Sequence, residues 1–573
     1  MLNAIVNLDL YRYEIHALIQ AFYPEESVKV WLESDWESGR KTARQKTVEA
    51  CDAEQDVPAD SRAFLCVHYF PDRIELRLNA GAEDSQVTAE DSQAPEKDAQ
   101  TPGERIPQAP QARTLQAPEG INYTEKSRTC KTALKHAIYE MLSELTGRTL
   151  PWGELIGVRP TKIAMTRILE YMDAAGGTDT SENTADADAP EKTADAPTTD
   201  LDAPGKAAYS PEKAVEYAAG YLMQEHLVSP GKAYLAANIA MRERQILSGI
   251  DYQNGYSLYI GIPFCPTTCL YCSFPSYSIE GFRDRVDEYL DALEKEIRAG
   301  AQMMQELGKK PDTVYIGGGT PTTLEPDQMD RLLTLIEECF AGGWQEFTVE
   351  AGRPDSITQE KLRVIKQHGI TRISVNPQTM KEETLRLIGR RHSVQDVIDA
   401  FYLARVEGFD NINMDLILGL PEETEEDVAR TISEIVRLSP DSLTVHSLAL
   451  KRGSRMQEWI LKNGWKSLRN TDEAVRIAAE GAAAMGMEPY YLYRQKNISG
   501  NFENVGYAKS GKAGCYNILI MEEKQSILAL GAGSVSKAVS NGTIVRSDNA
   551  KDIATYLQNI DEMIERKKKI FAE

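Results

Sequence analysis

The chain has 573 residues, of which 42% are hydrophobic and 26% charged, a composition typical of a soluble globular protein with several domains. Its formal net charge of −23 gives no basis for non-specific binding to nucleic acid. The sequence contains no run of about 18 uncharged apolar residues and no basic lead before an apolar run. We therefore expect no membrane span and no secretory signal, and a cytoplasmic location.

Two acidic, low-complexity stretches carry much of the negative charge. Residues 79–120 hold eight acids against three bases, and residues 173–205 hold nine against one. Because few large apolar side chains are present to offset the ordering entropy, we predict disordered insertions at about 79–120 and 173–209. Around them, apolar periodicity predicts strands over 5–13 and 64–78 and helices over 126–146, 160–172 and from Ser210. Residues 1–245 are expected to form an N-terminal α+β domain.

From about residue 256, short apolar runs alternate with helical segments. The runs lie at 257–262, 313–318, 346–351, 372–377, 412–420 and 441–450. The helices are expected at 283–307, 326–340, 358–368, 381–388, 394–408 and 423–438. Such repeated strand–helix units predict an α/β fold with a parallel sheet covered by helices over 250–455, followed by a small C-terminal region at 456–573. In such sheets the chemistry lies at the carboxyl ends of the strands.

Three of the eight cysteines, Cys265, Cys269 and Cys272, lie within eight residues directly after the first of these strands. The other five are scattered, which argues against a disulfide framework and for a reducing compartment. Three thiolates on one loop can hold three irons of a four-iron cubane. A structural zinc would require four ligands, and neither a nearby fourth cysteine nor a paired histidine is present. An iron without a protein ligand is a place where a small molecule can chelate.

Further motifs follow the later strands in order. They are YIGIPFC at 259–265, GGGTPT at 317–322, Gln378 followed by Arg390, and NMDLILGLP at 413–421. The cysteine spacing resembles the radical S-adenosylmethionine (SAM) superfamily. Over roughly residues 255–540 the chain resembles the oxygen-independent coproporphyrinogen III oxidase (coproporphyrinogen dehydrogenase) family, most closely its Z-type branch.

The resemblance implies a partial (β/α)6 TIM-like radical SAM barrel that binds one [4Fe–4S] cluster through the three cysteines, together with SAM. It implies a 5′-deoxyadenosyl radical that drives oxidative decarboxylation of coproporphyrinogen III to protoporphyrinogen IX, in haem (porphyrin) biosynthesis. The partners would be a porphyrinogen (tetrapyrrole) substrate and an unidentified electron donor. Two alternatives stay open: a haem-binding chaperone of the same family without oxidase activity, and a radical SAM enzyme with another substrate.

The resemblance also assigns roles to single residues. Tyr259, Gly319 and Glu350 would contact the SAM bound to the cluster, and Tyr259 is the candidate catalytic residue. Gly317 and Gly318, which lack side chains, would let backbone polar groups approach the methionyl amino group. Further residues match positions that hold a second molecule in the family, namely Tyr271, Thr320, Gln378, Arg390, Asp415 and Ala449.

A substrate with four propionates requires local cations, because the overall charge is negative. Lys451, Arg452 and Arg455 follow the sixth strand and are candidates for a propionate clamp, and Arg494 follows a later strand.

Two positions depart from the family pattern, and one stretch departs from the pattern of its chaperone branch. Gly261 stands where a histidine is usual, and Phe274 replaces a further cysteine. The stretch GCYN at 514–517 lacks the histidine of the chaperone branch, although Cys515 itself could ligate haem iron.

Overall fold

The computed structural model describes residues 2–23, 26–38, 63–78, 111–157, 159–175, 210–340, 342–451, 453–464, 468, 470–495, 502–540 and 542–572. The chain divides into two compact units, residues 1–156 with 223–229 and residues 157–222 with 230–573. This division differs from the boundary expected near residue 245. None of the helices in the described ranges combines the length and apolar character needed to cross a bilayer.

The first unit is built on a five-stranded sheet in the order β2-β1-β3-β4-β5. The strands are β1 (Leu2–Val6), β2 (Val28–Leu32), β3 (Leu65–Tyr69), β4 (Arg73–Leu78) and β5 (Gln111–Gln116). Helices α1 (Arg12–Phe22) and α3 (Arg128–Thr146) pack against each other and on this sheet. The prediction of a strand over 5–13 is wrong beyond Val6, because β1 ends there and helix α1 starts at Arg12. The apolar residues of this helix recur at helical spacing and are buried, namely Ile15, Leu18, Ile19 and Phe22.

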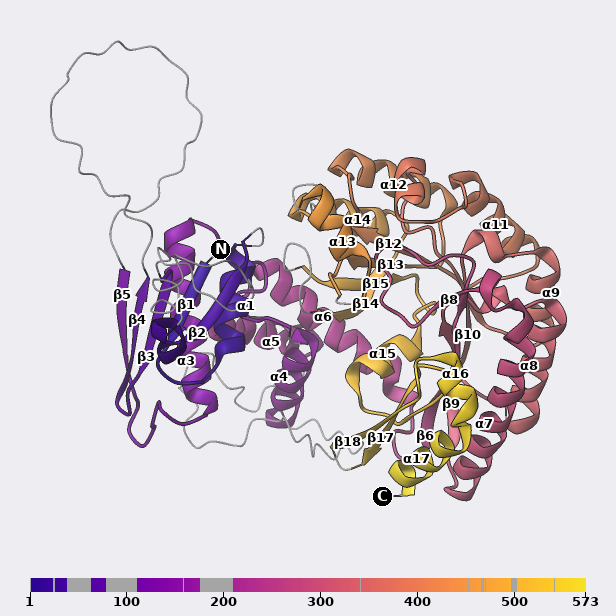
Figure 1. The fold of residues 1–573 in the computed structure, drawn as a ribbon, viewed down its shortest axis with the longest axis horizontal. Helices are drawn as coiled ribbons and strands as arrows, with labels where there is room; N and C mark the ends of the chain where they lie inside the picture. The colour runs from indigo at the N-terminus through magenta and orange to yellow at the C-terminus, as the bar shows by residue number, and fades with distance from the viewer. Residues whose placement is uncertain are drawn as a thin grey trace, which may run out of the picture. The chain divides into compact units, whose positions relative to one another are not determined.

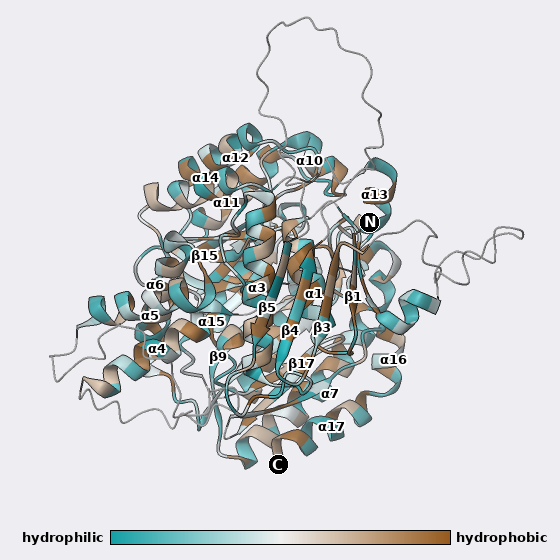
Figure 2. Cartoon of the chain, turned by 90° about the vertical axis from the view of Figure 1, so that its left-hand side faces the viewer, coloured by the Kyte–Doolittle hydropathy of each residue, from teal (hydrophilic) through white to brown (hydrophobic). Residues whose placement is uncertain are grey.

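The prediction of a disordered insertion over 79–120 is wrong at Gln111–Gln116, where strand β5 forms. It pairs antiparallel with β4 along its whole length, and Leu115 packs against the core. The ladder hydrogen bonds and this packing offset the ordering entropy that the local composition leaves uncompensated. Figure 2 shows the contrast in hydropathy between the polar edge strand β5 and the apolar strand β1, which lies between β2 and β3. Of the predicted insertions, residues 79–110 and 176–209 lie outside the described residues.

The second unit includes helices that the sequence analysis assigned to the N-terminal domain. These are α4 (Pro160–Ala174), α5 (Pro211–His226), of which residues 223–226 are grouped with the first unit, and α6 (Pro230–Ile246). Helix α4 packs on α6, and α6 packs on strand β14 (Glu488–Tyr493). Arg242 of α6 donates to the carbonyl oxygen of Pro489 at 3.2 Å. These contacts group the helical segment with the larger sheet.

That sheet has eleven strands in the order β14-β15-β13-β12-β11-β10-β9-β6-β16-β17-β18. Its centre is parallel and consists of β6 (Gly255–Ile262), β9 (Lys310–Gly318), β10 (Glu346–Gly352), β11 (Arg372–Val375), β12 (Ile412–Leu418) and β13 (Ser442–Ser447). The connecting helices are α7 (Val286–Glu306), α8 (Pro326–Cys339), α9 (Gln359–Gln367), α10 (Glu382–Leu387), α11 (Val394–Val406) and α12 (Glu425–Leu438). Figure 1 shows α7, α8, α9 and α11 along an arc outside the strands. The predicted α/β fold with a partial (β/α)6 barrel is confirmed.

The C-terminal region extends this sheet at both edges. Strands β14 and β15 (Asn504–Ala508) add antiparallel beside β13, and helix α15 (Cys515–Glu522) leads to β16 (Ile527–Leu530). Strand β16 pairs parallel with β6 and is therefore a seventh parallel strand, which the sequence analysis missed. Strands β17 (Val535–Ser540) and β18 (Thr543–Asp548) complete the edge.

A buried polar network fixes the C-terminal helix α17 (Ile560–Ala572) to the barrel. The carboxylate of Glu296 on α7 accepts hydrogen bonds from Lys567 Nζ (2.6 Å), Tyr556 Oη (2.7 Å), Asn549 Nδ2 (2.8 Å) and the Gly531 amide (2.8 Å). Gly531 follows β16 and packs so closely on Gly261 that an added Cβ would meet its carbonyl oxygen at 2.4 Å. The network therefore supports the backbone at the carboxyl end of β6, where the cysteine loop begins.

Candidate functional site

The predicted site residues lie at one edge of the parallel sheet. The cysteine loop follows β6, the glycines end β9, Glu350 lies near the end of β10, and Gln378 follows β11. Asp415 lies within β12, and Ala449 follows β13 by two residues. Because the carboxyl ends of parallel strands meet at one edge, these side chains from distant parts of the chain can converge on one ligand.

The cluster loop, residues 265–272, is anchored by hydrogen bonds from several directions. The Leu270 amide donates to the carbonyl oxygen of Ile388 at 2.9 Å, and the Thr267 hydroxyl donates to that of Gly389 at 2.7 Å. Arg455 Nη2 donates to the carbonyl oxygen of Thr268 at 2.6 Å. Arg455, a candidate for the propionate clamp, therefore uses its guanidinium to hold this loop.

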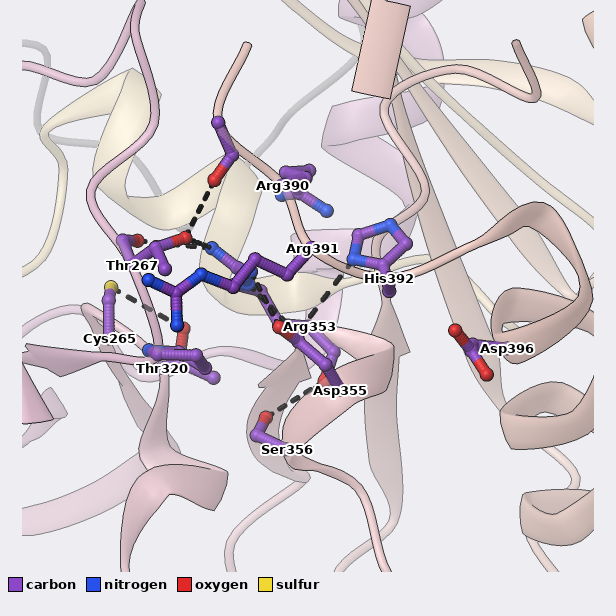
Figure 3. Close-up of polar contacts among 12 residues, drawn as sticks. Cys265, Thr267, Thr320, Arg353, Asp355, Ser356, Arg390, Arg391, His392 and Asp396 are labelled. Atoms are coloured by element: carbon purple, nitrogen blue, oxygen red, sulfur yellow. Dashed lines mark hydrogen bonds and ion pairs between the residues drawn. The ribbon is translucent and has the colours of Figure 1, made fainter. Parts of the chain in front are cut away.

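The three loop cysteines carry free thiols, and each has a donor or a cation beside it. The Thr320 hydroxyl donates to Cys265 Sγ at 3.5 Å (Figure 3), and Arg353 Nη1 lies 4.0 Å from Cys269 Sγ. Burial raises the pKa of the Cys265 thiol to about 11 and also raises the pKa of Cys272, an effect that nearby Lys451 opposes.

Donors and positive charge beside sulfur fit thiolates that bind iron. Among the described residues, no group of three His, Cys, Asp or Glu side chains is placed to hold one metal ion between them.

The glycines at the end of β9 leave room that a side chain would fill. An added Cβ on Gly317 would meet Glu350 Oε2 and a ring carbon of Tyr315 at 2.9 Å, and one on Gly319 would meet the Phe264 carbonyl oxygen at 2.5 Å. Gly318 has φ of 106°, which L-residues rarely adopt. The turn can therefore bring its backbone close to a ligand without side chains in the way.

Glu350 faces a stack of tyrosine rings. The Tyr315 hydroxyl donates to Glu350 Oε1, and the Tyr315 ring lies 4.4 Å from the Tyr516 ring and 6.2 Å from the Tyr259 ring, between centroids. Burial raises the pKa of Glu350 to about 7, with Tyr315 opposing and Asp415 adding to the shift. This carboxyl group can thus accept a hydrogen bond from a hydroxyl or ammonium group, and its charge changes near neutral pH.

A second group of predicted residues gathers after β11. Arg390 donates from Nη1 to the carbonyl oxygen of Asn376 at 2.5 Å and from Nη2 to the Tyr271 hydroxyl at 3.4 Å. Gln378 has φ of 67° and bridges to β12 through Asp415 and Ile417. Asn376 Oδ1, Gln378 Oε1 and Arg390 Nε are buried and have no hydrogen-bond partner among the described residues. Because buried polar atoms are normally paired, these three atoms fit a polar ligand at this place.

The remaining basic candidates differ in environment. Lys451 Nζ lies 5.5 Å from the centroid of the exposed Phe274 ring, a cation–π distance. Arg494 is buried, and burial lowers its pKa to about 10. Arg452 lies outside the described residues.

Sequence reasoning missed Arg353, Asn376, Tyr315 and Tyr516. Tyr315 carries a usable signal, because it stands two residues before Gly317 on a strand and so shares its face. Arg353 and Asn376 follow strands, where a polar residue is usually solvated, and only the tertiary packing buries them. Tyr516 comes from α15, far along the chain, and no pattern connects it to β9.

Comparison with known proteins gives three findings. The family model of the radical SAM superfamily matches residues 259–435. The oxygen-independent coproporphyrinogen-III oxidase-like protein HemZ of Bacillus subtilis is 36% identical over 78% of this chain and 82% of its own length, and the heme chaperone HemW of the same organism is 31% identical over 53% and 76%. The structure of coproporphyrinogen III oxidase (HemN) from Escherichia coli aligns with a TM-score of 0.44 and 24% identity, over 56% of this chain and 73% of that chain.

Proposed function

Since this chain belongs to the family of oxygen-independent coproporphyrinogen III oxidase-like proteins, in its Z-type branch within the radical SAM superfamily, we propose that it catalyses the oxidative decarboxylation of coproporphyrinogen III to protoporphyrinogen IX. Membership confirms the predicted cofactors, a [4Fe–4S] cluster and SAM. When bound, they supply the hydrogen-atom abstraction that such a reaction requires.

In this proposal Cys265, Cys269 and Cys272 would hold the [4Fe–4S] cluster, to which SAM would bind. The backbone at Gly317–Gly318–Gly319 receives the methionyl end, and Glu350 accepts a hydrogen bond from the ribose or the ammonium group. Tyr259, stacked in the tyrosine group beside Glu350, orients the bound cofactor and limits access of water.

The observation that carries the proposal is the set of three unpaired buried polar atoms on Asn376, Gln378 and Arg390. Arg390 lies beside Tyr271 of the cluster loop, and the three atoms are two amide oxygens and one guanidinium nitrogen that can pair with a polar ligand. Such a set suits carboxylate and ammonium groups, which a second SAM molecule or a substrate propionate would present. Thr320, Asp415 and Ala449 complete the assigned group.

The rival function is haem binding without porphyrinogen chemistry, as the name of the HemW relative indicates for that protein. In this chain Cys515, the candidate haem ligand, is buried. Its amide donates to Glu346 Oε2 at 2.5 Å, and burial raises the pKa of its thiol to about 12. Because Cys515 is buried, haem could reach its sulfur only if the residues around it moved, so this observation favours the oxidase.

The test is an anaerobic turnover assay. Reconstituted protein receives SAM, dithionite and coproporphyrinogen III, and the tetrapyrroles and 5′-deoxyadenosine are separated by chromatography. Cys272→Ala should abolish both products, whereas Cys339→Ala, which replaces a free cysteine at the end of α8 and outside the cluster loop, should leave both unchanged.

Each outcome separates the candidate functions. A divinyl product that depends on SAM supports the oxidase. Tight binding of haem with no tetrapyrrole product overturns it in favour of the chaperone. Formation of 5′-deoxyadenosine alone overturns the substrate assignment and points to a radical SAM enzyme with another substrate.

A further inference from the structure

Arg353 is a buried cation at the cluster loop to which the sequence analysis gave no role. It follows β10 directly, and 3% of its surface is exposed. Its Nη1 donates to the hydroxyl of Thr267 at 2.6 Å and to the Thr267 carbonyl oxygen at 3.0 Å, and lies 4.0 Å from Cys269 Sγ. One nitrogen of the guanidinium therefore faces both the loop backbone and a sulfur atom.

The other side of the guanidinium is held by Asp355. Arg353 Nε donates to Asp355 Oδ1 at 2.9 Å, and Nη2 donates to Oδ2 at 2.6 Å, a bidentate geometry that fixes the plane of the fork. The buried ring of His392 lies behind the carboxylate, with Nδ1 3.8 Å from Oδ1 (Figure 3). Although burial opposes it, His392 and Arg353 hold the pKa of Asp355 well below its usual range. Arg353 thus cannot turn away from the loop without breaking this pair.

We propose that Arg353 is a positioning residue that sets the reduction potential of the [4Fe–4S] cluster by holding positive charge against the sulfur of Cys269. The inference rests on the proposed role of Cys269 as an iron ligand. Reduction adds one electron to the cluster, and hydrogen bonds and positive charge at the ligand sulfurs favour the more negative, reduced form. Arg353 therefore raises the potential and makes the electron easier to deliver.

The alternative is that Arg353 only braces the loop through Thr267. The two roles predict different effects of charge-changing substitutions on the midpoint potential of the cluster. Arg353→Met removes the positive charge and should lower the midpoint potential. Asp355→Asn keeps Arg353 but removes a neighbouring negative charge, and should raise it. A brace alone predicts that both variants, which weaken the same pair, change the potential in the same direction or not at all.

Arg391→Met is the matched control. It removes the same charge near the same loop, but Arg391 is 66% exposed and pairs with Glu280 at 3.0 Å on the surface. Water and salt screen such a charge, so the midpoint potential of the cluster in Arg391→Met should equal that of the wild type.

The experiment is an anaerobic redox titration of the reconstituted full chain, followed by electron paramagnetic resonance (EPR), with iron and sulfide analysis. For Arg353→Met we expect the reduced cluster to be at least about tenfold less favoured, which is a fall of about 59 mV for a one-electron couple. Asp355→Asn should shift the potential upward.

Equal potentials in all four proteins, or a shift of both pair variants in one direction, would overturn the inference while leaving the proposed function intact. A wild-type chain that binds no iron would overturn both. If Arg353→Met fails to assemble a cluster, the direction of the Asp355→Asn shift decides alone.

Discussion

Replacing Gly319 by alanine should weaken the binding of SAM. The new Cβ would lie 2.5 Å from the carbonyl oxygen of Phe264, 2.9 Å from its carbonyl carbon and 3.0 Å from the carbonyl oxygen of Ile262. All three are backbone atoms of the segment that leads into Cys265, so no change of rotamer relieves the overlap. The Gly319 amide also donates to the Ile262 carbonyl oxygen at 2.7 Å, which ties the two segments together.

The backbone must therefore separate by about 0.5–1 Å, and overpacking of this kind costs about 1–3 kcal/mol. If the glycine turn holds the methionyl end of SAM, that cost appears as an affinity about 5- to 150-fold weaker. Gly261→Ala is the matched control at the same barrel mouth, because its Cβ would meet its nearest neighbour, the Leu530 carbonyl oxygen, at 3.4 Å, an ordinary contact.

The assay is calorimetric titration of SAM into anaerobically reconstituted protein of known iron and sulfide content. Gly261→Ala should bind SAM as the wild type does, and Gly319→Ala should bind it at least about fivefold more weakly. Equal affinity of the two variants at equal cluster content would refute the reasoning that the turn at Gly319 shapes the SAM site.

Two further predictions concern buried carboxyl groups. Burial raises the pKa of Glu350 to about 7, so the affinity for SAM should fall below about pH 7, where protonation removes the hydrogen-bond acceptor. Tyr315→Phe removes a hydrogen bond that lowers this pKa and should therefore move the loss of affinity to higher pH. An unchanged pH profile in the same titrations would contradict the assignment of Glu350 to the SAM site. Lys567→Met leaves the buried Glu296 without its cation and should lower the free energy of unfolding by about 3–5 kcal/mol, whereas Lys568→Met, at an exposed position, should leave it nearly unchanged. Equal hydrogen-exchange rates of the α17 amides in the two variants would show that the buried network does not hold this helix.

The alternation of apolar runs and helices predicted the parallel core of the barrel, because each buried strand is a continuous apolar run and each covering helix has an apolar face. Strand β16 escaped prediction since its four apolar residues, Ile527–Leu530, are too few to show a period, and its parallel partner β6 lies far away in the sequence. Strand β5 escaped because its pairing with β4 spans a long insertion of polar composition.

The candidate site was predictable where the chemistry needs a fixed spacing. Three cysteines within eight residues are informative because one loop must present all three thiolates. The role of Arg353 could not be predicted, because a charged residue after a strand is usually solvated. Its burial depends on its contacts with Asp355 and Thr267. Asn376 was missed for the same reason. Residues that act through tertiary contacts leave no periodicity in the sequence.

The central claim is that Cys265, Cys269 and Cys272 hold a cluster with one iron open to SAM. The most direct test is the EPR spectrum of the reconstituted, dithionite-reduced chain, recorded before and after SAM is added. We predict about four irons and four sulfides per chain and a spectrum that changes when SAM binds, with the cluster lost in Cys269→Ala and retained in Cys339→Ala. A chain that takes up no iron, or a reduced cluster whose spectrum stays the same at saturating SAM, would contradict the claim.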